Sequence, residues 1–435
     1  MDNHSRFRRF ALVPLIIGPA FLACPLSAAA AGEEAMVLAQ EPARPTQAAP
    51  AAALTLADCV QIALGRQPAL AAQRASVAAA ETGRQAADNL RLAGLVSKEL
   101  PIRRRQAALG VVIAAAGASQ AEWETIYAVT RNYFTVLYAR QQQMVVKDVA
   151  DDLRATLVAA RGLVESGARR DVTQSNLDQI SSYLLLAEAR QVEAERGAER
   201  ALAALREAIG VDLCFNLQIA AESLPNPRPV LTREQVVEWA LGRRGELAQA
   251  VSAAEVTALE VQAQDASCRI SVRTFATGGD IHARPVPQGY HNADYRPSAV
   301  GLEMPAMLFG HRADRVHQAQ ELSARAQAVV EKTRNLITLE AENTFLLWQQ
   351  AAEQIDKTSQ AADKATRLGK NTQRDFAGNQ NVRVRDVLDA LVLSAEARRA
   401  NNEALYRQLL ALADLQRVTA GGFILGLDGR PQGQP

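Results

Sequence analysis

Apolar residues recur at helical spacing along four long segments of this chain. Residues 119–164 and 172–209 predict two long helices joined by a short Gly-containing turn, and residues 310–372 and 385–419 repeat the arrangement. Because each helical residue adds about 1.5 Å, rods of this length cannot be buried inside a globular domain. They need lateral partners, so the pattern predicts two long antiparallel helical hairpins that pack side by side.

These hairpins belong to an internal duplication that covers most of the chain. Residues 54–66 recur as residues 231–243, and both copies begin with a Thr that is followed three residues later by Asp or Gln, a helix-capping signal. Downstream markers recur at a larger offset, where Phe134, Gly167 and Gly210 match Phe345, Gly378 and Gly421. The second copy has therefore gained residues after its first helix.

A third pair of matching segments suggests where this gain lies. Glu99-Leu-Pro101 resembles Glu303-Met-Pro305, which places an insertion of 27 residues before this corner (an offset of 204 against 177). A further gain of seven residues (211 against 204) would then lengthen the following helix by one heptad, which leaves its buried face unrotated.

The inserted residues alternate in polarity as β-strands do. Ile270, Val272 and Thr274 share one face of a predicted strand, residues 298–304 alternate again, and a Gly/Pro-rich loop separates the two. The sequence thus predicts a β-hairpin over about 268–304. Its strands have the length of membrane strands, although a small soluble hairpin that caps the helix ends fits the pattern equally well.

The first residues have the pattern of an export signal: basic residues, an apolar run over 11–23, and then small residues. Cys24 follows Phe-Leu-Ala and is also a candidate for lipidation, although Phe21 and Pro25 disfavour it. The expected segments are a signal peptide (1–31), an Ala/Pro-rich leader (32–53), a first repeat (54–210), a linker (211–230), a second repeat (231–421) and a flexible tail (422–435).

Composition narrows the classes of function. The chain has 48 Lys+Arg against 47 Asp+Glu, without the basic excess of a nucleic-acid-binding protein. The five His and four Cys are scattered, and the sequence lacks a phosphate loop, a G-x-S-x-G motif and a Cys-x-x-Cys pair. We expect a protein that is not an enzyme and uses no metal or other cofactor.

Taken together, the order and duplication of these segments resemble the TolC-like outer membrane factor family, over residues 54–421. The resemblance is carried by the paired Leu-Thr openings, by Val300-Gly-Leu-Glu-Met-Pro305 with Leu308-Phe-Gly310, and by Asp386-Val-Leu-Asp-Ala390 after a Gly-bearing tip. It implies a mainly α fold with duplicated helical hairpins, assembled as a homotrimeric α-barrel in the periplasm below a β-barrel in the outer membrane lipid. It also implies docking on a periplasmic adaptor and on an inner-membrane RND or ABC transporter.

One departure from the family is visible in the sequence. Family members carry a strand hairpin in both repeats, whereas the first repeat here has no room for one before Lys98-Glu-Leu-Pro101. The β element would then be reduced to the second repeat. A trimer would then have six strands in total. A barrel of six strands is too narrow for a lumen, because side chains already fill the interior of an eight-stranded barrel.

The family match suggests candidate functional residues. Asp386 and Asp389 share a helix face and match acidic positions at the periplasmic entrance, where three copies would form a carboxylate ring that gates the channel. Acids in a first helical turn are also stabilised by the helix dipole, without further function. The tips that would meet the adaptor are Gly167, Ala168, Gly378 and Asn379; as turn glycines, Gly167 and Gly378 would have a positive φ.

Further candidates lie on and around the predicted hairpin. Arg269, Arg273 and Glu303 would face the lumen of a barrel, or solvent in a soluble hairpin, and His282, His291 and His311 are expected to be surface residues, not metal ligands.

The sequence leaves three functions open. The leading one is an outer membrane exit duct for efflux or type I secretion. The alternatives are a periplasmic helical scaffold without a pore and a lipid-anchored, adaptor-like coiled coil.

Overall fold

A computed structural model describes residues 53–90, 97–212, 214–267, 308–378 and 382–425, all within one compact unit, Ala51–Pro435. Long helices dominate the unit. They are α1 (Leu56–Arg66), α2 (Pro68–Asn89), α3 (Leu100–Ser166), α4 (Gln174–Ile209), α5 (Arg233–Arg243), α6 (Gly245–Ala266), α7 (Arg312–Ala377) and α8 (Val384–Val418). A two-stranded parallel ladder pairs β1 (Ala53–Leu54) with β2 (Gln218–Ile219).

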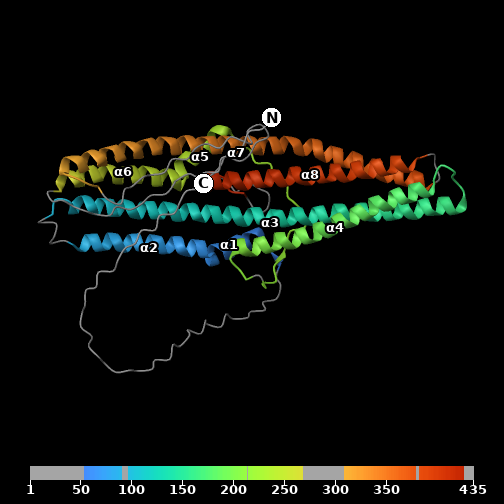
Figure 1. Cartoon of the computed structure of the whole chain (residues 1–435), viewed down its shortest axis with the longest axis horizontal. Coiled ribbons are helices and arrows are strands. Elements are labelled where there is room, and N and C mark those ends of the chain that lie inside the picture. The colour runs from blue at the N-terminus through green and yellow to red at the C-terminus, as the bar shows by residue number, and fades with distance from the viewer. Residues whose placement is uncertain (1–52, 91–96, 213, 268–307, 379–381, 426–435) are drawn as a thin grey trace, which may run out of the picture. The chain divides into compact units, whose positions relative to one another are not determined.

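Within this unit the two longest helices run side by side with the shorter ones (Figure 1). Helix α3 packs against α2 and α6 along one half and against α4 and α8 along the other, while α7 packs against α6 and then α8. The packing order across the bundle is therefore α2 with α4, then α3, then α6 with α8, then α7. The two predicted helical hairpins are confirmed as α3–α4 and α7–α8.

The duplication is closer than the sequence suggested. Helices α1 and α5 each have 11 residues, α2 and α6 each 22, α3 and α7 have 67 and 66, and α4 and α8 have 36 and 35. The predicted one-heptad lengthening of the second long helix is wrong, because α7 is no longer than α3. The whole gain lies in the connection between α6 and α7.

Local signals explain most helix starts. Thr55 begins α1 and exchanges hydrogen bonds with Asp58, and Thr232 does the same with Gln235 at the start of α5, as predicted. Helix α3, however, begins at Leu100 and not near residue 119. The intervening residues are rich in Ala, which favours a helix without producing an amphipathic pattern.

Two connections lie at the end of the bundle where α2 and α6 finish and α3 and α7 begin, and they differ greatly in length. Residues 90–99 join α2 to α3, whereas residues 267–311 join α6 to α7. Two membrane strands of about 9–11 residues each would not fit into the first connection. The predicted hairpin at 268–304 lies outside the described residues.

Near mid-length, apolar residues from both repeats form the largest core cluster, which includes Val129, Leu137, Leu205, Ile337 and Leu412. The chain after α8 closes this core. Gly421 has a φ of +75°, and a Cβ there would lie 2.2 Å from the Trp123 ring, so only glycine fits.

A buried ionic network borders this core where α8 ends beside the α5–α6 junction. Arg417 contacts Glu340 at 2.6 Å and Asp414, and Arg244 contacts Glu340 and Glu246; all five are at least nine-tenths buried. Burial by itself raises the pKa of Glu340, but Arg244 and Arg417 outweigh it and hold this pKa at about 2.

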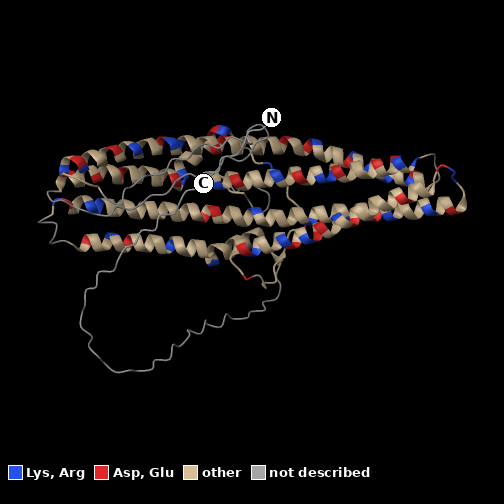
Figure 2. Ribbon diagram, viewed as in Figure 1, with Lys and Arg blue, Asp and Glu red and all other residues tan. Residues whose placement is uncertain are grey.

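Charges of both signs are interspersed along the described helices (Figure 2), which agrees with the balanced composition. Among these helices, none combines the length and apolar character that crossing a membrane would require.

Candidate functional site

The α3–α4 and α7–α8 turns lie together at one end of the bundle (Figure 1), and we call this end the tip. Gly167 caps the C-terminus of helix α3, and its φ of +63° places it in the left-handed region, as predicted for a turn glycine. Gly378 caps the C-terminus of α7 with a φ of −75°, so the predicted positive φ is wrong there. Its N–H donates to the Arg374 carbonyl at 2.8 Å, which continues the helical turn instead.

One apolar cluster joins the two hairpins at the tip. Phe376 of α7 is fully buried, and Val172 of the first turn and Leu388 of α8 are almost so. Residues of α3 and α4, including Leu153 and Ile180, complete the cluster. The tips of the two hairpins are therefore packed against each other within a single chain.

Arg169 covers this cluster from the first turn. Its guanidinium carbon lies 5.6 Å from the centre of the Phe376 ring, a cation–π contact between the two tips. Arg169 also donates to Asp171, with Nε to Oδ1 at 2.9 Å. This hydrogen bond, supported by the nearby charge of Arg383, lowers the pKa of Asp171.

Two further contacts join the hairpins above the tip. The Gln373 amide of α7 donates to the Asp152 carbonyl at 2.8 Å and to Thr156 Oγ1 at 3.2 Å, both on α3. Arg398 of α8 pairs with Asp148 of α3 at 2.7 Å. With the Arg169–Phe376 contact, they form a series of links between the first hairpin and the second.

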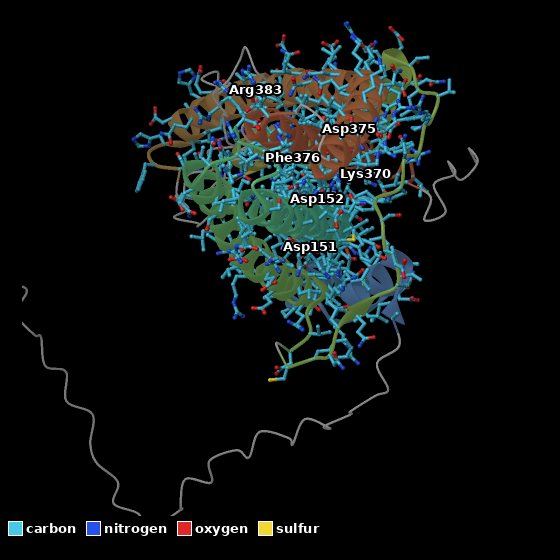
Figure 3. All side chains as sticks on the ribbon, turned by 90° about the vertical axis from the view of Figure 1, so that its right-hand side faces the viewer. Asp151, Asp152, Lys370, Asp375, Phe376 and Arg383 are labelled. Atoms are coloured by element: carbon cyan, nitrogen blue, oxygen red, sulfur yellow. The ribbon has the colours of Figure 1, made fainter. Side chains whose placement is uncertain are left out.

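Asp152 is poorly accommodated among these links. It lies half-buried on α3. Figure 3, a view onto the tip, labels it next to Asp151 and also labels Lys370 of α7. Partial burial and then the neighbouring Asp148 carboxylate raise the pKa of Asp152, although Lys370 and Arg398 oppose this shift. The ionised carboxylate is therefore disfavoured in the packed state.

Beside these links, α3, α7 and α8 enclose a groove of about 650 Å³. Polar and charged side chains dominate its lining, including those of Lys147, Asp148, Asp151, Asp363, Arg398, Asn401 and Asn402. Gln141 also lines it, and its buried Oε1 has no hydrogen-bond partner among the residues that the structure describes.

Asp386 and Asp389 are both exposed at the start of α8. Asp386 accepts the backbone N–H of Arg383 at 3.3 Å, so it caps its own helix, and Asp389 lies 3.7 Å from Arg385. The two carboxylates share the exposed face of α8, as their spacing predicted, while Val387 and Leu388 are buried on another face. Both thus have a local role that is independent of any gate.

Several predicted site residues lie outside the described part of the chain: Cys24, Arg269, Arg273, His282, His291, Glu303 and Asn379. Ala168 is exposed at the tip. His311 begins α7, and its backbone N–H donates to Asp314 at 3.0 Å. Within the described ranges, three or more His, Cys, Asp or Glu side chains do not gather into a metal-binding group.

Sequence reasoning missed Arg169 and Phe376 as partners. The pattern gave the position of each turn but no signal that the two turns meet. A large aromatic residue beside a tip glycine, where solvent-exposed turns are usually polar, is the one feature that could have pointed to a contact there.

Comparison with known proteins supports the fold. No protein-family model and no curated protein sequence matches the chain. Among solved structures it is similar to the outer-membrane channel OprN, with a TM-score of 0.69 and 14% identity over 84% of this chain and 90% of that one. It is also similar to VceC of Vibrio cholerae (TM-score 0.64, 17% identity, 84% and 96% covered) and to the CmeC channel of Campylobacter jejuni (0.66, 13%, 84% and 86%). The chain has the TolC-like fold of these outer membrane proteins.

Proposed function

We propose that this protein is an outer membrane exit duct for efflux or type I secretion. The duct itself is passive, and a partner pump drives the solutes through it. The observation that carries the proposal is the fit to whole channel subunits: the match to OprN covers 90% of that chain. A fit of this extent includes both hairpins and the mid-length region, not a single shared helical pair. In this role the protein carries out no reaction and needs no cofactor.

The proposed homotrimer is supported by the two edges of the bundle. Helices α2 and α6 are equivalent in the duplication, yet α2 buries only Leu70, whereas α6 buries eleven residues because it lies between α3 and α7. On the same edge, α4 exposes Tyr183, Leu185, Leu186 and Val192. The opposite edge, α7, exposes Leu346 and Leu368. Unlike edges that meet between copies form a head-to-tail contact, and such contacts generate a ring when the rotation from one copy to the next closes.

At the tip we place the entrance and the docking surface. Asp386 and Asp389 would form the carboxylate ring of the gate, and the turns with Gly167, Ala168, Gly378 and Asn379 would meet a periplasmic adaptor coupled to an inner-membrane RND or ABC transporter. Exposure of the two aspartates on one face of α8 supports the first assignment. In the opposite direction, Arg269, Arg273 and Glu303 would line the passage through the outer membrane.

Planar-bilayer conductance tests the duct. We expect discrete current steps from detergent-purified protein, with larger steps from the Asp386→Ala/Asp389→Ala variant, because the carboxylate ring narrows the entrance. Folding of the variant is checked by circular dichroism, since Asp386 also caps α8. If neither the wild type nor the variant gives current steps although both are folded and inserted, the duct is refuted. Current steps of equal size from the two proteins would refute the gate.

A second candidate function is a periplasmic helical scaffold without a pore. It is favoured by the ten residues between α2 and α3, which cannot form the membrane hairpin that the family pattern places there. Washing membranes with alkali separates the candidates: a duct stays with the outer membrane, and a scaffold is released.

A further inference from the structure

The groove between α3, α7 and α8 contains hydrogen-bond acceptors that are left open. Its volume of about 650 Å³ lies in the range of small-molecule sites. Gln141 Oε1 is buried there without a donor from the described chain, and Asp363 of α7 lines the groove without an ion pair or hydrogen bond to any described residue. Because buried polar atoms are normally paired, open acceptors in a groove of this size favour a ligand that donates hydrogen bonds.

The charges along the groove favour a cation. Three carboxylates line it against two cations. One of these cations, Arg398, is already neutralised by Asp148 at 2.7 Å. Arg154, which pairs with Asp151 from outside the groove, is shared with Glu188. An anion would therefore bind beside an excess of carboxylates, whereas an ammonium group reduces their mutual repulsion.

The open acceptors and the carboxylates lie at different levels of the groove. Along α3, Gln141 and Asp151 are ten residues apart, which corresponds to about 15 Å. Helices α3 and α7 run in the same direction, and Gln373 of α7 contacts α3 at the residue after Asp151. Asp363 precedes Gln373 by ten residues, so it is about level with Gln141. Met144 lines the groove between the two levels and is 51% exposed.

We propose that this groove binds an aliphatic polyamine, a flexible chain with an ammonium group at each end. One ammonium group donates to Asp363 and to Gln141 Oε1, the other pairs with Asp151, and the methylene chain lies on Met144. A metal ion is a poorer occupant, because the described acidic side chains do not gather in the groups of three or more that would hold one. The site belongs to one chain and does not depend on the proposed duct.

Isothermal titration calorimetry of the detergent-purified full chain with spermidine tests this site. Two comparison ligands separate its parts: butylamine has one ammonium group, like a lysine side chain, and octane-1,8-diol has a chain without charge. We expect saturable binding of one spermidine per chain, and binding of both comparison ligands that is weaker by about tenfold or more, because each lacks at least one charge-assisted contact.

Variants locate the site. Asp363→Asn should weaken spermidine binding about tenfold, because it removes one charge-assisted hydrogen bond. Gln141→Met removes a neutral acceptor and should weaken binding about fivefold. Lys147→Gln removes a competing cation from the lining and should strengthen binding about threefold. The matched control is Glu353→Gln, which removes an exposed carboxylate of α7 outside the groove and should leave binding unchanged.

Three results would overturn the proposal: no saturable binding of spermidine, equal binding of butylamine, or equal losses for Asp363→Asn and Glu353→Gln. Circular dichroism checks that each variant is folded. A gain for Lys147→Gln is the strictest test, because a damaged fold weakens binding and does not strengthen it. Conductance is measured separately: current steps without spermidine binding would refute the groove site alone, and spermidine binding without current steps would refute the duct alone.

Discussion

Arg104 and Arg315 occupy equivalent positions in the two repeats and donate to equivalent residues, although one acceptor is a backbone carbonyl and the other a side-chain oxygen. Arg104 reaches from α3 to the Ala87 carbonyl near the end of α2, at 3.0 Å, and Arg315 reaches from α7 to Gln264 near the end of α6, at 2.8 Å. Ala87 and Gln264 are themselves equivalent (177 residues apart). Each arginine thus fixes the start of a long helix to the end of the preceding short one, whatever length of chain lies between them.

The two arginines should differ in their contribution to stability. Arg315 is 2% exposed and also donates to the Gly310 carbonyl, whereas Arg104 is only partly buried. Arg315→Met leaves the buried side-chain oxygen of Gln264 without this donor, so we expect a loss of about 2–4 kcal/mol in the free energy of unfolding. The matched Arg104→Met should cost about 1 kcal/mol. Urea titration measures both, and equal losses would contradict this difference in burial.

Glu340 should be essential to the stability of the mid-length region. Glu340→Gln leaves Arg244 and Arg417 buried with less opposing charge, and we expect a cost of about 3–5 kcal/mol. The control is Glu342→Gln on the same helix; Glu342 pairs with Arg233 near the surface at 2.9 Å, and its loss should cost less than about 1 kcal/mol.

The pH dependence of this contribution has a definite sign. The pKa of Glu340 is about 2 in the folded protein against an ordinary 4.5, so its stabilisation is complete above pH 4.5 and is lost as the pH falls toward 2. Wild type and Glu340→Gln should therefore converge in unfolding free energy in acid. A difference that stays constant from pH 7 to pH 3 would argue against the ionised network.

Much of the fold was predictable because helices of this length impose their periodicity on the sequence. The capping pairs at Thr55 and Thr232 and the turn at Gly167 are local signals. Such signals can be recognised in the sequence without knowing which helices pack together. Helix α3 was predicted too short, because its Ala-rich start packs with small side chains that give no amphipathic stripe.

The contacts between elements were not predictable in the same way. Glu340 is equivalent to Val129, which is fully buried in the core, so the duplication itself gives no warning of an ionic network. The pairing of Arg169 with Phe376 depends on how two distant turns meet, which no short-range pattern encodes. The candidate gate was found through family resemblance, and the exposure of Asp386 and Asp389 on one face of α8 supports it.

Asp152 should weaken the contact between the hairpins at neutral pH. Its pKa is raised in the folded protein, so its contribution to stability increases as the pH falls through that pKa and is complete below the ordinary value of 3.8. Asp152→Asn removes the disfavoured charge, and we expect a higher unfolding midpoint at pH 7 and a smaller gain at pH 4. Asp151→Asn is the control, because Asp151 is exposed and pairs with Arg154 at 2.7 Å. A lower midpoint for Asp152→Asn would show that the nearby charges of Lys370 and Arg398 outweigh burial.

Phe376 should hold the two tips together. Phe376→Ala empties the centre of the apolar cluster and removes the ring that Arg169 covers, so we expect the hairpin ends to separate while the core near mid-length stays folded. Spin labels at the exposed positions Glu165 and Arg385 measure this by double electron–electron resonance. The control is Leu368→Ala on the same helix, where a half-exposed side chain is removed. We expect a longer and broader distance distribution for Phe376→Ala only; an unchanged distribution would mean that the links at Gln373 and Arg398 suffice to keep the tips closed.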